Sequence, residues 1–246
     1  MTKEKLRKKL NLNYLTLTNK THRVGELDFP EIMCPYVVEP DYLALYTEKC
    51  NYHKTELTAI CFYQFDDKFD RIDGLFNAIY YDNKKLLKEF KQRFKNCKLF
   101  ILPDYSQCGD VELIERLYRQ FRTRIVALWL TVNLNAIAIP NISYGCESDF
   151  KYMLLGLEKC EVVAFSIKGS LRKKEERDLL LNAIKYVVDK LPLKLIVVYS
   201  VCKKDEDAYN YFKYAIDKNI KVIIPDNVLK QRNIERSGTQ NGKKSK

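Results

Sequence analysis

The chain has 246 residues, of which 46% are hydrophobic and 30% charged, a composition typical of a soluble globular domain with a substantial core. No apolar run reaches the roughly 18 residues that a membrane helix needs, and the basic start MTKEKLRKKL leads into no apolar signal core. We therefore expect a cytoplasmic protein that makes no membrane contact.

The net charge of +11 is concentrated at the two ends of the chain. Residues 1–10 contain five Lys or Arg and one Glu, and residues 230–246 contain six and one, so the intervening residues 11–229 carry only +2. Basic tails of this kind bind nucleic-acid phosphates non-specifically, and equally they can be solvated ends. The last stretch, RSGTQNGKKSK, has the polar composition of a disordered tail.

The eight cysteines do not form a recognisable metal or disulfide pattern. No C-x-x-C pair occurs, and a zinc site would depend on Cys34, Cys50, His53 and Cys61, of which only the CNYH fragment has a suitable spacing. Several cysteines lie inside apolar segments, as Cys61 does in AICFYQF. We expect reduced thiols, most of them buried.

Residues 1–54 are expected to form a basic N-terminus and an extended cover, because prolines at 30, 35 and 40 interrupt regular elements. Residues 55–229, in which short apolar runs alternate with amphipathic stretches, are expected to form an α/β domain. Continuous apolar runs are typical of strands that are buried on both faces. The expected strands are 58–63, 98–103, 136–142, 162–167, 194–199 and 220–224.

Helices are expected between these strands. The region 69–96 is predicted to form two helices that meet near Asp82–Asn83. Acidic residues open the last two helices, and Pro192 and Asn219 come directly after them, which are the usual start and stop signals. The other predicted helices are 147–158, 172–191 and 205–218.

The stretch RIVALWLTV at 124–132 permits two interpretations. Its composition is β-like and would form a hairpin with 136–142, but a stripe of apolar residues at helical spacing runs through it from Asp110 onward. We favour one long helix over 110–132, with Asn133 or Asn135 in its cap.

Strands separated by helices imply parallel pairing with right-handed crossovers. The expected fold is α/β, a mainly parallel sheet of about six strands with helices on both faces. The alternative is an incomplete or distorted β/α barrel, to which residues 24–45 could supply a further strand. In either fold, ligands bind at the carboxyl ends of the strands.

Three predicted strands end on proline followed by Asp104, Asn141 or Asp226. Proline ends a strand and Asp or Asn caps the next turn or helix, so the pattern is first a structural one. Asp104 nevertheless shares the predicted rim with Asp66 and Asp67, which come after the first strand of the domain. Grouped carboxylates are the ligands that Mg²⁺ prefers. The candidate metal ligands are therefore Asp66, Asp67 and Asp104, and the candidate catalytic residues are these three and Ser106.

The stretch SIKGS lies at the end of the strand at 162–167 and offers a glycine turn, a lysine and two hydroxyls before a helix. Such a turn can form an anion nest, although the P-loop spacing G-x-x-x-x-G-K-[ST] is absent. The candidate phosphate-binding residues are Ser166, Lys168, Gly169 and Ser170. A plain strand-to-helix turn is the competing interpretation.

Six short motifs taken together resemble a known family. They are, in chain order, FDDKFDR, LPDYS, R-x-x-x-x-W, AIPNISYG, SIKG and IVVYS. In order and spacing they resemble the uncharacterised family catalogued as domain of unknown function 4417, which occurs in bacteria, phages and mobile elements. The resemblance covers roughly residues 55–230. Three positions depart from the family pattern, since Tyr105 stands in place of Phe, Tyr144 in place of Trp and Ser200 in place of Gly. The resemblance carries over no activity.

Two hypotheses remain from the sequence, which leaves open whether the protein is an enzyme. The first is a hydrolase or transferase that depends on Mg²⁺ or Mn²⁺ and acts on a phosphate-bearing substrate, a nucleotide or a nucleic acid. The alternative is a non-enzymatic module of a phage or mobile element that binds nucleic acid or a host protein through its basic tails.

Overall fold

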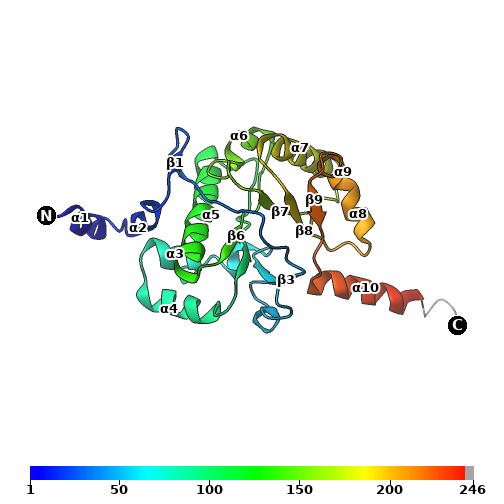
Figure 1. Ribbon diagram of the computed structural model, residues 1–246, viewed down its shortest axis with the longest axis horizontal. Coiled ribbons are helices and arrows are strands. Elements are labelled where there is room, and N and C mark those ends of the chain that lie inside the picture. Colours follow the sequence, from blue (N-terminus) through cyan, green and yellow to red (C-terminus); the bar gives the residue numbers. More distant parts are fainter. Residues whose placement is uncertain (242–246) are drawn as a thin grey trace.

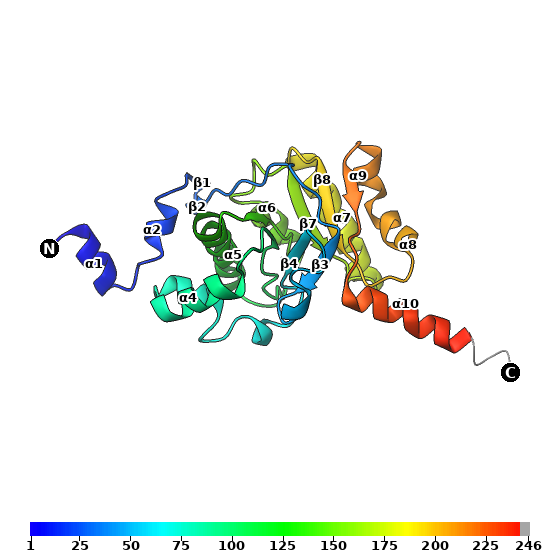
Figure 2. The same ribbon diagram turned by 60° about the horizontal axis from the view of Figure 1, so that its bottom comes forward.

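The computed structural model describes residues 1–241 of the protein, with side chains to residue 236. Helices α1 (Lys3–Lys9) and α2 (Leu15–Thr18) come first, followed by an antiparallel ribbon of β1 (Arg23–Val24) and β2 (Phe29–Pro30). Both ribbon views place α1 beyond one side of the body (Figures 1 and 2). Within the described residues, no helix is long and apolar enough to cross a membrane.

Seven parallel strands form the centre of the described structure. They make two sheets, one in the order β3-β4-β5-β6 and one in the order β7-β8-β9. Most of their side chains are buried, as expected for continuous apolar runs. The strands are β3 (Tyr42–Leu45), β4 (Thr58–Cys61), β5 (Leu99–Ile101), β6 (Ile137–Ile139), β7 (Val162–Ser166), β8 (Leu195–Tyr199) and β9 (Lys221–Ile223).

The two sheets also meet at their outer edges. A parallel bridge pairs Asn141 with Ala164, whose N–H donates to the Pro140 carbonyl at 2.7 Å, and this contact is called the β6–β7 seam below. A second parallel bridge pairs Tyr42 with Asp226, and this contact is the β9–β3 seam. The seven strands therefore succeed one another in a ring, joined at the seams by only a few hydrogen bonds.

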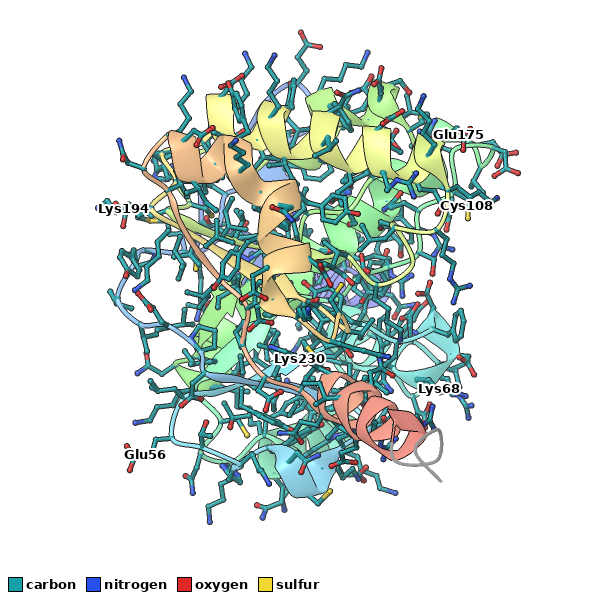
Figure 3. All side chains as sticks on the ribbon, turned by 90° about the vertical axis from the view of Figure 1, so that its right-hand side faces the viewer. Glu56, Lys68, Cys108, Glu175, Lys194 and Lys230 are labelled. Carbon is teal, nitrogen blue, oxygen red and sulfur yellow. The ribbon has the colours of Figure 1, made fainter. Side chains whose placement is uncertain are left out.

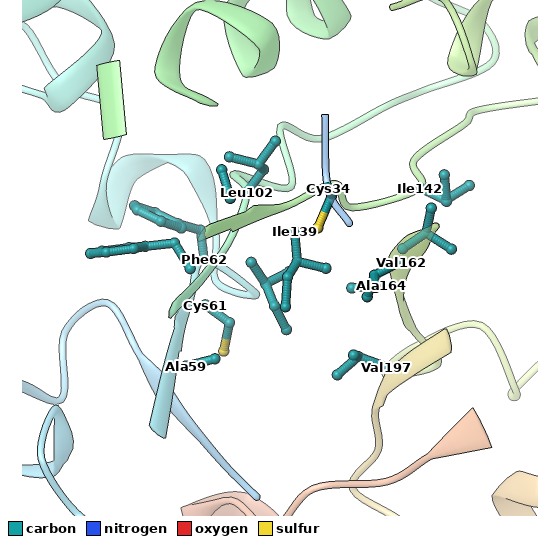
Figure 4. Close-up of a cluster of buried hydrophobic side chains, with 14 of the residues drawn as sticks. Cys34, Ala59, Cys61, Phe62, Leu102, Ile139, Ile142, Val162, Ala164 and Val197 are labelled. Carbon is teal, nitrogen blue, oxygen red and sulfur yellow. The ribbon is translucent and has the colours of Figure 1, made fainter. Parts of the chain in front are cut away.

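The space between the two sheets is filled by small and medium apolar side chains. Figure 4 shows Ala59 and Cys61 of β4 on one side, and Ala164 of β7 and Val197 of β8 on the other, pointing toward one another. All four are fully buried. Close packing of this kind makes the ring interior a core.

Helices surround the strands in the ribbon views (Figure 1). Asn135, at φ +51°, gives α5 a left-handed C-cap, as the helical interpretation of the ambiguous segment requires. The helices are α3 (Leu75–Tyr80), α4 (Lys84–Arg93), α5 (Leu113–Leu134), α6 (Phe150–Met153), α7 (Lys174–Lys190), α8 (Asp205–Tyr209), α9 (Lys213–Asp217) and α10 (Val228–Asn241), with 3-10 turns at Lys49–Asn51, Asp66–Lys68, Glu147–Asp149 and Asn210–Phe212.

The expected α/β class with parallel strands is confirmed, but the single sheet of about six strands is wrong. The six expected strands are present, and a seventh, β3, comes from residues expected to form part of the cover. Local hydrophobic pattern could not separate the two arrangements, because strands in an open three-layer sheet and in a closed ring are both apolar on both faces.

The expected helices differ in length from the observed ones. The hairpin at 124–132 is absent and α5 runs through it, while the break between α3 and α4 falls at Asp82, as predicted. The predicted helix 147–158 shrinks to α6 and a 3-10 turn, and 205–218 is divided into α8 and α9 by another. All eight cysteines are free, and Cys34, Cys61, Cys97 and Cys160 are buried.

The expected boundary at residues 54 and 55 does not divide the structure. Strand β3 pairs with β4 along its length, so residues 42–45 belong to the sheet. Cys34 also lies in the core, and its carbonyl accepts the Glu161 N–H at 2.9 Å. The proline-containing segment before residue 55 is therefore partly irregular, but it is anchored to the rest of the fold by these contacts.

We expected a disordered tail over residues 230–246, but its first part belongs to α10, which extends to Asn241. Asn227 caps this helix, since its Oδ1 accepts the Lys230 N–H at 3.0 Å and its Nδ2 donates to the Ser200 carbonyl at 2.8 Å. The Lys230 ammonium pairs with Asp205 at 2.6 Å. Residues 242–246 lie outside the described residues.

Candidate functional site

The carboxyl ends of the strands share one edge of the molecule, as parallel pairing requires. In the side view of Figure 3, Lys68 and Cys108, which come after β4 and β5, lie toward one side, and Glu175, which comes after β7, lies there too. Glu56 and Lys194, which precede β4 and β8, lie toward the opposite side. We call the first edge the mouth of the ring, and it is where a ligand site is expected.

Three side chains at the mouth form a hydrogen-bonded chain. Tyr63, Asp104 and Asn141 come after β4, β5 and β6, which are neighbours in one sheet. The Tyr63 hydroxyl donates to Asn141 Oδ1 at 2.8 Å, and Asn141 Nδ2 donates to Asp104 Oδ1 at 2.8 Å. Tyr63 and Asn141 are buried, whereas Asp104 keeps part of its surface exposed. The chain ends on a carboxyl group that solvent can reach.

The Asp104 carboxyl is held in an unusual protonation state. Desolvation raises its pKa to about 7, the Asn141 hydrogen bond opposes this rise, and the negative charge of Asp66 adds to it. A carboxyl with a pKa near 7 is partly protonated and partly ionised at neutral pH. It can therefore both donate and accept a proton, which is the requirement for general acid–base catalysis.

The aromatic neighbours of Asp104 extend this low-dielectric region. Burial, together with the charge of Asp104, raises the pKa values of the Tyr63 and Tyr144 hydroxyls. The Tyr63 ring packs on Tyr199, with ring centroids 4.7 Å apart. Tyr63 and Tyr144 therefore lie near Asp104, in keeping with the desolvation that disfavours the charged form of its carboxyl.

Asp66 lies at the mouth, but both of its carboxylate oxygens are engaged. Oδ1 accepts from the Ser106 N–H at 3.1 Å and from the Ser106 hydroxyl at 3.0 Å. Oδ2 accepts from Arg119 Nη1 of α5 at 2.7 Å. The structure thus brings Asp66, Ser106 and Asp104 together as predicted, with Asp66 joining two mouth loops and acting on Asp104 through its charge.

Asp67 turns away from this group. Its carboxylate pairs with Lys68 at 2.8 Å on the surface, and its carbonyl accepts from Arg71 Nε at 2.6 Å. It lines a separate pocket of about 360 Å³ together with Lys49 and Arg93. Adjacent positions in the chain therefore point to different sides of the mouth.

The three predicted metal ligands do not form one cluster. Among the residues that the structure describes, no three His, Cys, Asp or Glu side chains are grouped so that they could hold a metal ion. Asp66 and Asp104 are the two carboxylates that remain close enough to influence one another. A divalent ion would need further oxygen ligands from a substrate.

The predicted phosphate-binding turn lies at the same mouth, after β7. Ser166 Oγ accepts the Lys168 N–H at 3.3 Å, and the Lys168 side chain is exposed. Gly169 has φ +95°, a conformation that L residues avoid, and an added Cβ would meet no atom within 4 Å. Burial raises the pKa of the Cys61 thiol in the ring interior, and the charge of Lys168 opposes this rise. The turn therefore presents a cation near the mouth with open space beside it.

Arginines of α5, which the sequence analysis did not single out, hold the mouth loops. Arg116 pairs with Asp149 beside α6, Arg119 with Asp66 after β4, and Arg122 with Asp70 in the same loop. The Arg122 guanidinium also lies 4.3 Å from the centre of the Tyr105 ring. Their i, i+3 spacing places these arginines on neighbouring positions of α5, and this spacing is a signal that the sequence does contain.

The Asp and Asn residues that follow proline at three strand ends, which we call the proline–Asx pattern, have two different roles in the structure. Asp226 is structural, since its Oδ1 accepts the Asn227 N–H at 2.8 Å and its Oδ2 accepts from Gln231 of α10 at 2.5 Å. Asp104 and Asn141 bond to each other across two strands. Sequence reasoning located Asn141 through this pattern but did not identify it as a partner of Asp104.

Comparison with known proteins agrees with the motif resemblance. The family model described as Domain of unknown function (DUF4417) matches residues 21–219, which is most of the chain. No curated protein and no solved structure matches the chain significantly. The match begins well before residue 55, in keeping with the anchored N-terminal segment described above.

Proposed function

We propose that this protein, which belongs to the family described as Domain of unknown function (DUF4417), is an enzyme with Asp104 as its general acid–base group. We infer that the ring of seven parallel strands is a distorted β/α barrel, whose mouth is the usual position of an active site. The observation that carries the proposal is the series of hydrogen bonds from buried Tyr63 through Asn141 to Asp104, together with the burial that raises the pKa of Asp104 to about 7.

The hydrogen bonds between Tyr63, Asn141 and Asp104 orient the side-chain amide of Asn141. The Tyr63 hydroxyl donates to Asn141 Oδ1, so the amide oxygen faces Tyr63 and the amide nitrogen faces Asp104. Asn141 then donates to Asp104 Oδ1 and fixes the carboxyl plane. The protonated carboxyl would donate to a leaving oxygen, and the ionised form would accept a proton from water or from a substrate hydroxyl.

The proposed substrate bears a phosphate. Support comes from the turn after β7, where Lys168 and the open space at Gly169 lie at the mouth, with Ser166 and Ser170 beside them. Lys168 would bind the phosphate as a point charge. The reaction class is hydrolysis or group transfer, because both need a proton to move at an oxygen atom.

We propose that Mg²⁺ or Mn²⁺ assists the reaction, with two protein carboxylates in place of the three that the sequence predicted. The cation would bind to oxygen atoms of the substrate phosphate, and Asp104 and Asp66, which lie close enough to influence one another, are the carboxylates that would help to hold it. Asp67 is removed from the proposed ligand set because its carboxylate pairs with Lys68 at the surface. No catalytic step above depends on the metal.

Two measurements test the proposal. The first is the carboxyl carbon chemical shift of Asp104 against pH, for which we expect a midpoint near 7. The second is hydrolysis of bis-p-nitrophenyl phosphate and of nucleoside triphosphates, with and without Mg²⁺ or Mn²⁺, by the unmodified protein and by Asp104→Asn. We expect Asp104→Asn to lower the rate by a factor of about 10² to 10⁴.

Asp67→Asn is the matched control, since it removes a mouth carboxylate that makes no contact with the chain of Tyr63, Asn141 and Asp104. It should retain nearly full activity. A midpoint near 4 for Asp104, or equal rates for Asp104→Asn and the unmodified protein, would contradict the assignment.

A further inference from the structure

A groove on a different side of the molecule carries a strong positive charge. It is a pocket of about 480 Å³ formed by α2, α3, α4 and the C-terminal end of α5. Four lysines and a single acidic residue, Asp82, line it; the lysines are Lys20, Lys84, Lys88 and Lys91. We call this feature the lysine groove.

Outside the two ends of the chain, positive charge is concentrated in the segment that contains α4. Residues 84–98, which contain α4, include seven Lys or Arg and one Glu, a net charge of +6. The rest of the segment 11–229 carries −4, although the segment as a whole has only +2. The near-neutral body is therefore the sum of one strongly basic helix and an acidic remainder.

Helix α4 presents its lysines as a stripe. Lys84, Lys88 and Lys91 stand at i, i+4 and i+7, so they lie on one face of the helix over a length of about 10 Å. Their side chains are exposed. Lys84 pairs with Asp82 at 2.6 Å, but no ion pair is found for Lys20, Lys88 or Lys91 among the described residues. The groove therefore has an excess of uncompensated positive charge.

The N-terminal helix extends this surface. Residues 1–10 carry +4, and α1 lies beyond α2, away from the body, in both ribbon views (Figures 1 and 2). No residue of α1 is buried. Its position next to α2 makes the basic surface longer than the groove alone, as a polymer of negative charges would require.

We propose that the lysine groove binds the phosphodiester backbone of a nucleic acid without reading its sequence. The ligand class is indicated by the row of unpaired lysines, because a backbone offers repeated phosphates along a line. The aromatic residues of the groove are not base platforms. Trp129 is buried, and Tyr14 already stacks on Tyr80 with centroids 4.8 Å apart. Nucleic-acid binding is thereby centred on α4 and the groove, with the basic N-terminal residues 1–10 as an extension of the same surface.

The groove is separate from the mouth. Helix α5 contacts the mouth loops through Arg119 and lines the groove with Val132 and Asn133. With a rise of 1.5 Å per residue, these two regions are about 20 Å apart along α5. The inference therefore does not depend on the function of Asp104, and each can fail without the other.

The test is fluorescence anisotropy of the full-length protein with a labelled DNA duplex of about 20 base pairs, at KCl concentrations from about 50 to 200 mM. We expect Lys88→Gln/Lys91→Gln to reduce the slope of log K against log salt by about 2 and to weaken binding by about ten- to a hundredfold. The single strand and an RNA duplex of the same sequence show which backbone is preferred. Circular dichroism confirms that the variants are folded.

The matched control is Lys213→Gln/Lys218→Gln, which removes the same charge from exposed positions at the start of α9 and directly after its end, on the far side of the body from α4 (Figure 1). It should change the slope by much less. Equal losses in the two double variants would show that only net charge matters and would overturn the proposal. Unchanged binding in Lys88→Gln/Lys91→Gln would do the same, as would groove-dependent binding to phosphatidylserine vesicles without binding to any nucleic acid.

Discussion

Replacing Asp104 by Asn should abolish one component of the pH dependence of stability. Asn keeps the side-chain size and an acceptor oxygen for Asn141 Nδ2, but it cannot ionise. In the unmodified protein the pKa of Asp104 rises from 3.8 to about 7 on folding, chiefly because the carboxyl is desolvated. The folded state therefore holds the proton more tightly, and the unfolded state releases it first. The contribution is fully present below about pH 4 and is lost as the pH rises to about 7.

The magnitude can be worked from the size of the shift. A rise of about three pKa units corresponds to about 4 kcal/mol of the free energy of unfolding at 1.36 kcal/mol per unit. Because Asp104 keeps part of its surface exposed, solvent screening lowers this figure, and we expect a loss of roughly 2 to 4 kcal/mol between pH 4 and pH 8. Near pH 5.5 this residue alone should contribute a slope of about −1.4 kcal/mol per pH unit.

The assay is urea unfolding of the unmodified protein and of Asp104→Asn at a series of pH values, with the free energy of unfolding taken by linear extrapolation. The Asn variant should gain stability relative to the unmodified protein as the pH rises through this range. Asp67→Asn, at an exposed carboxylate, should show no such trend. A difference between Asp104→Asn and the unmodified protein that stays constant with pH would refute the argument that the carboxyl is desolvated.

Three further predictions concern stability, each measured by thermal or urea unfolding. Tyr63→Phe should lower the free energy of unfolding by about 1 to 3 kcal/mol, because it leaves the buried Asn141 Oδ1 without a donor. Tyr199→Phe should change it by less than about 0.5 kcal/mol, since the buried Tyr199 hydroxyl has no partner among the described residues. Equal losses in the two variants would contradict this prediction. Gly156→Ala should cost about 3 kcal/mol or more, because Gly156 has φ +80° and an added Cβ would lie far inside contact distance of the Pro30 carbonyl oxygen, and an unchanged melting temperature would exclude it. Arg124→Lys should lower the free energy of unfolding by about 2 to 4 kcal/mol. Buried Arg124 donates to the Leu155 carbonyl at 3.0 Å and to the Met153 carbonyl at 2.8 Å, and one ammonium group cannot reproduce this pair of hydrogen bonds. A loss below about 1 kcal/mol would argue against the importance of the pair.

Much of the fold could be predicted because its determinants are local. The strands are apolar runs, and the long helix α5 has a continuous stripe and an asparagine that adopts the left-handed cap. Closure of the ring was expected only as the alternative fold, because the seams depend on bridges between residues far apart in the chain, Tyr42 with Asp226 and Asn141 with Ala164. Strand β3 was expected only in the barrel alternative, within residues 24–45, because its four residues lie in a segment that prolines had marked as irregular.

The positions of the candidate residues were easier to predict than their contacts. The proline–Asx pattern located Asp104 and Asn141, but not the bond between two residues that lie 37 positions apart. Asp66 and Ser106 were placed correctly at the same rim, whereas the direction of Asp67 depends on a single 3-10 turn. The basic helix α4 was hidden because a sum over residues 11–229 cancelled its charge against an acidic remainder.

The β6–β7 seam has a consequence for proton affinity. Asn141 is the residue that closes the ring at this edge and also the residue that donates to Asp104. Asn141 and Asp104 follow neighbouring strands of one sheet, so only a movement of Asn141 relative to the end of β5 would withdraw the amide from the carboxyl. Since that hydrogen bond lowers the pKa of Asp104, its loss would make the carboxyl hold its proton more tightly. A ligand that displaces Asn141 from Asp104 would thereby favour the protonated carboxyl and take up a proton from solvent as it binds.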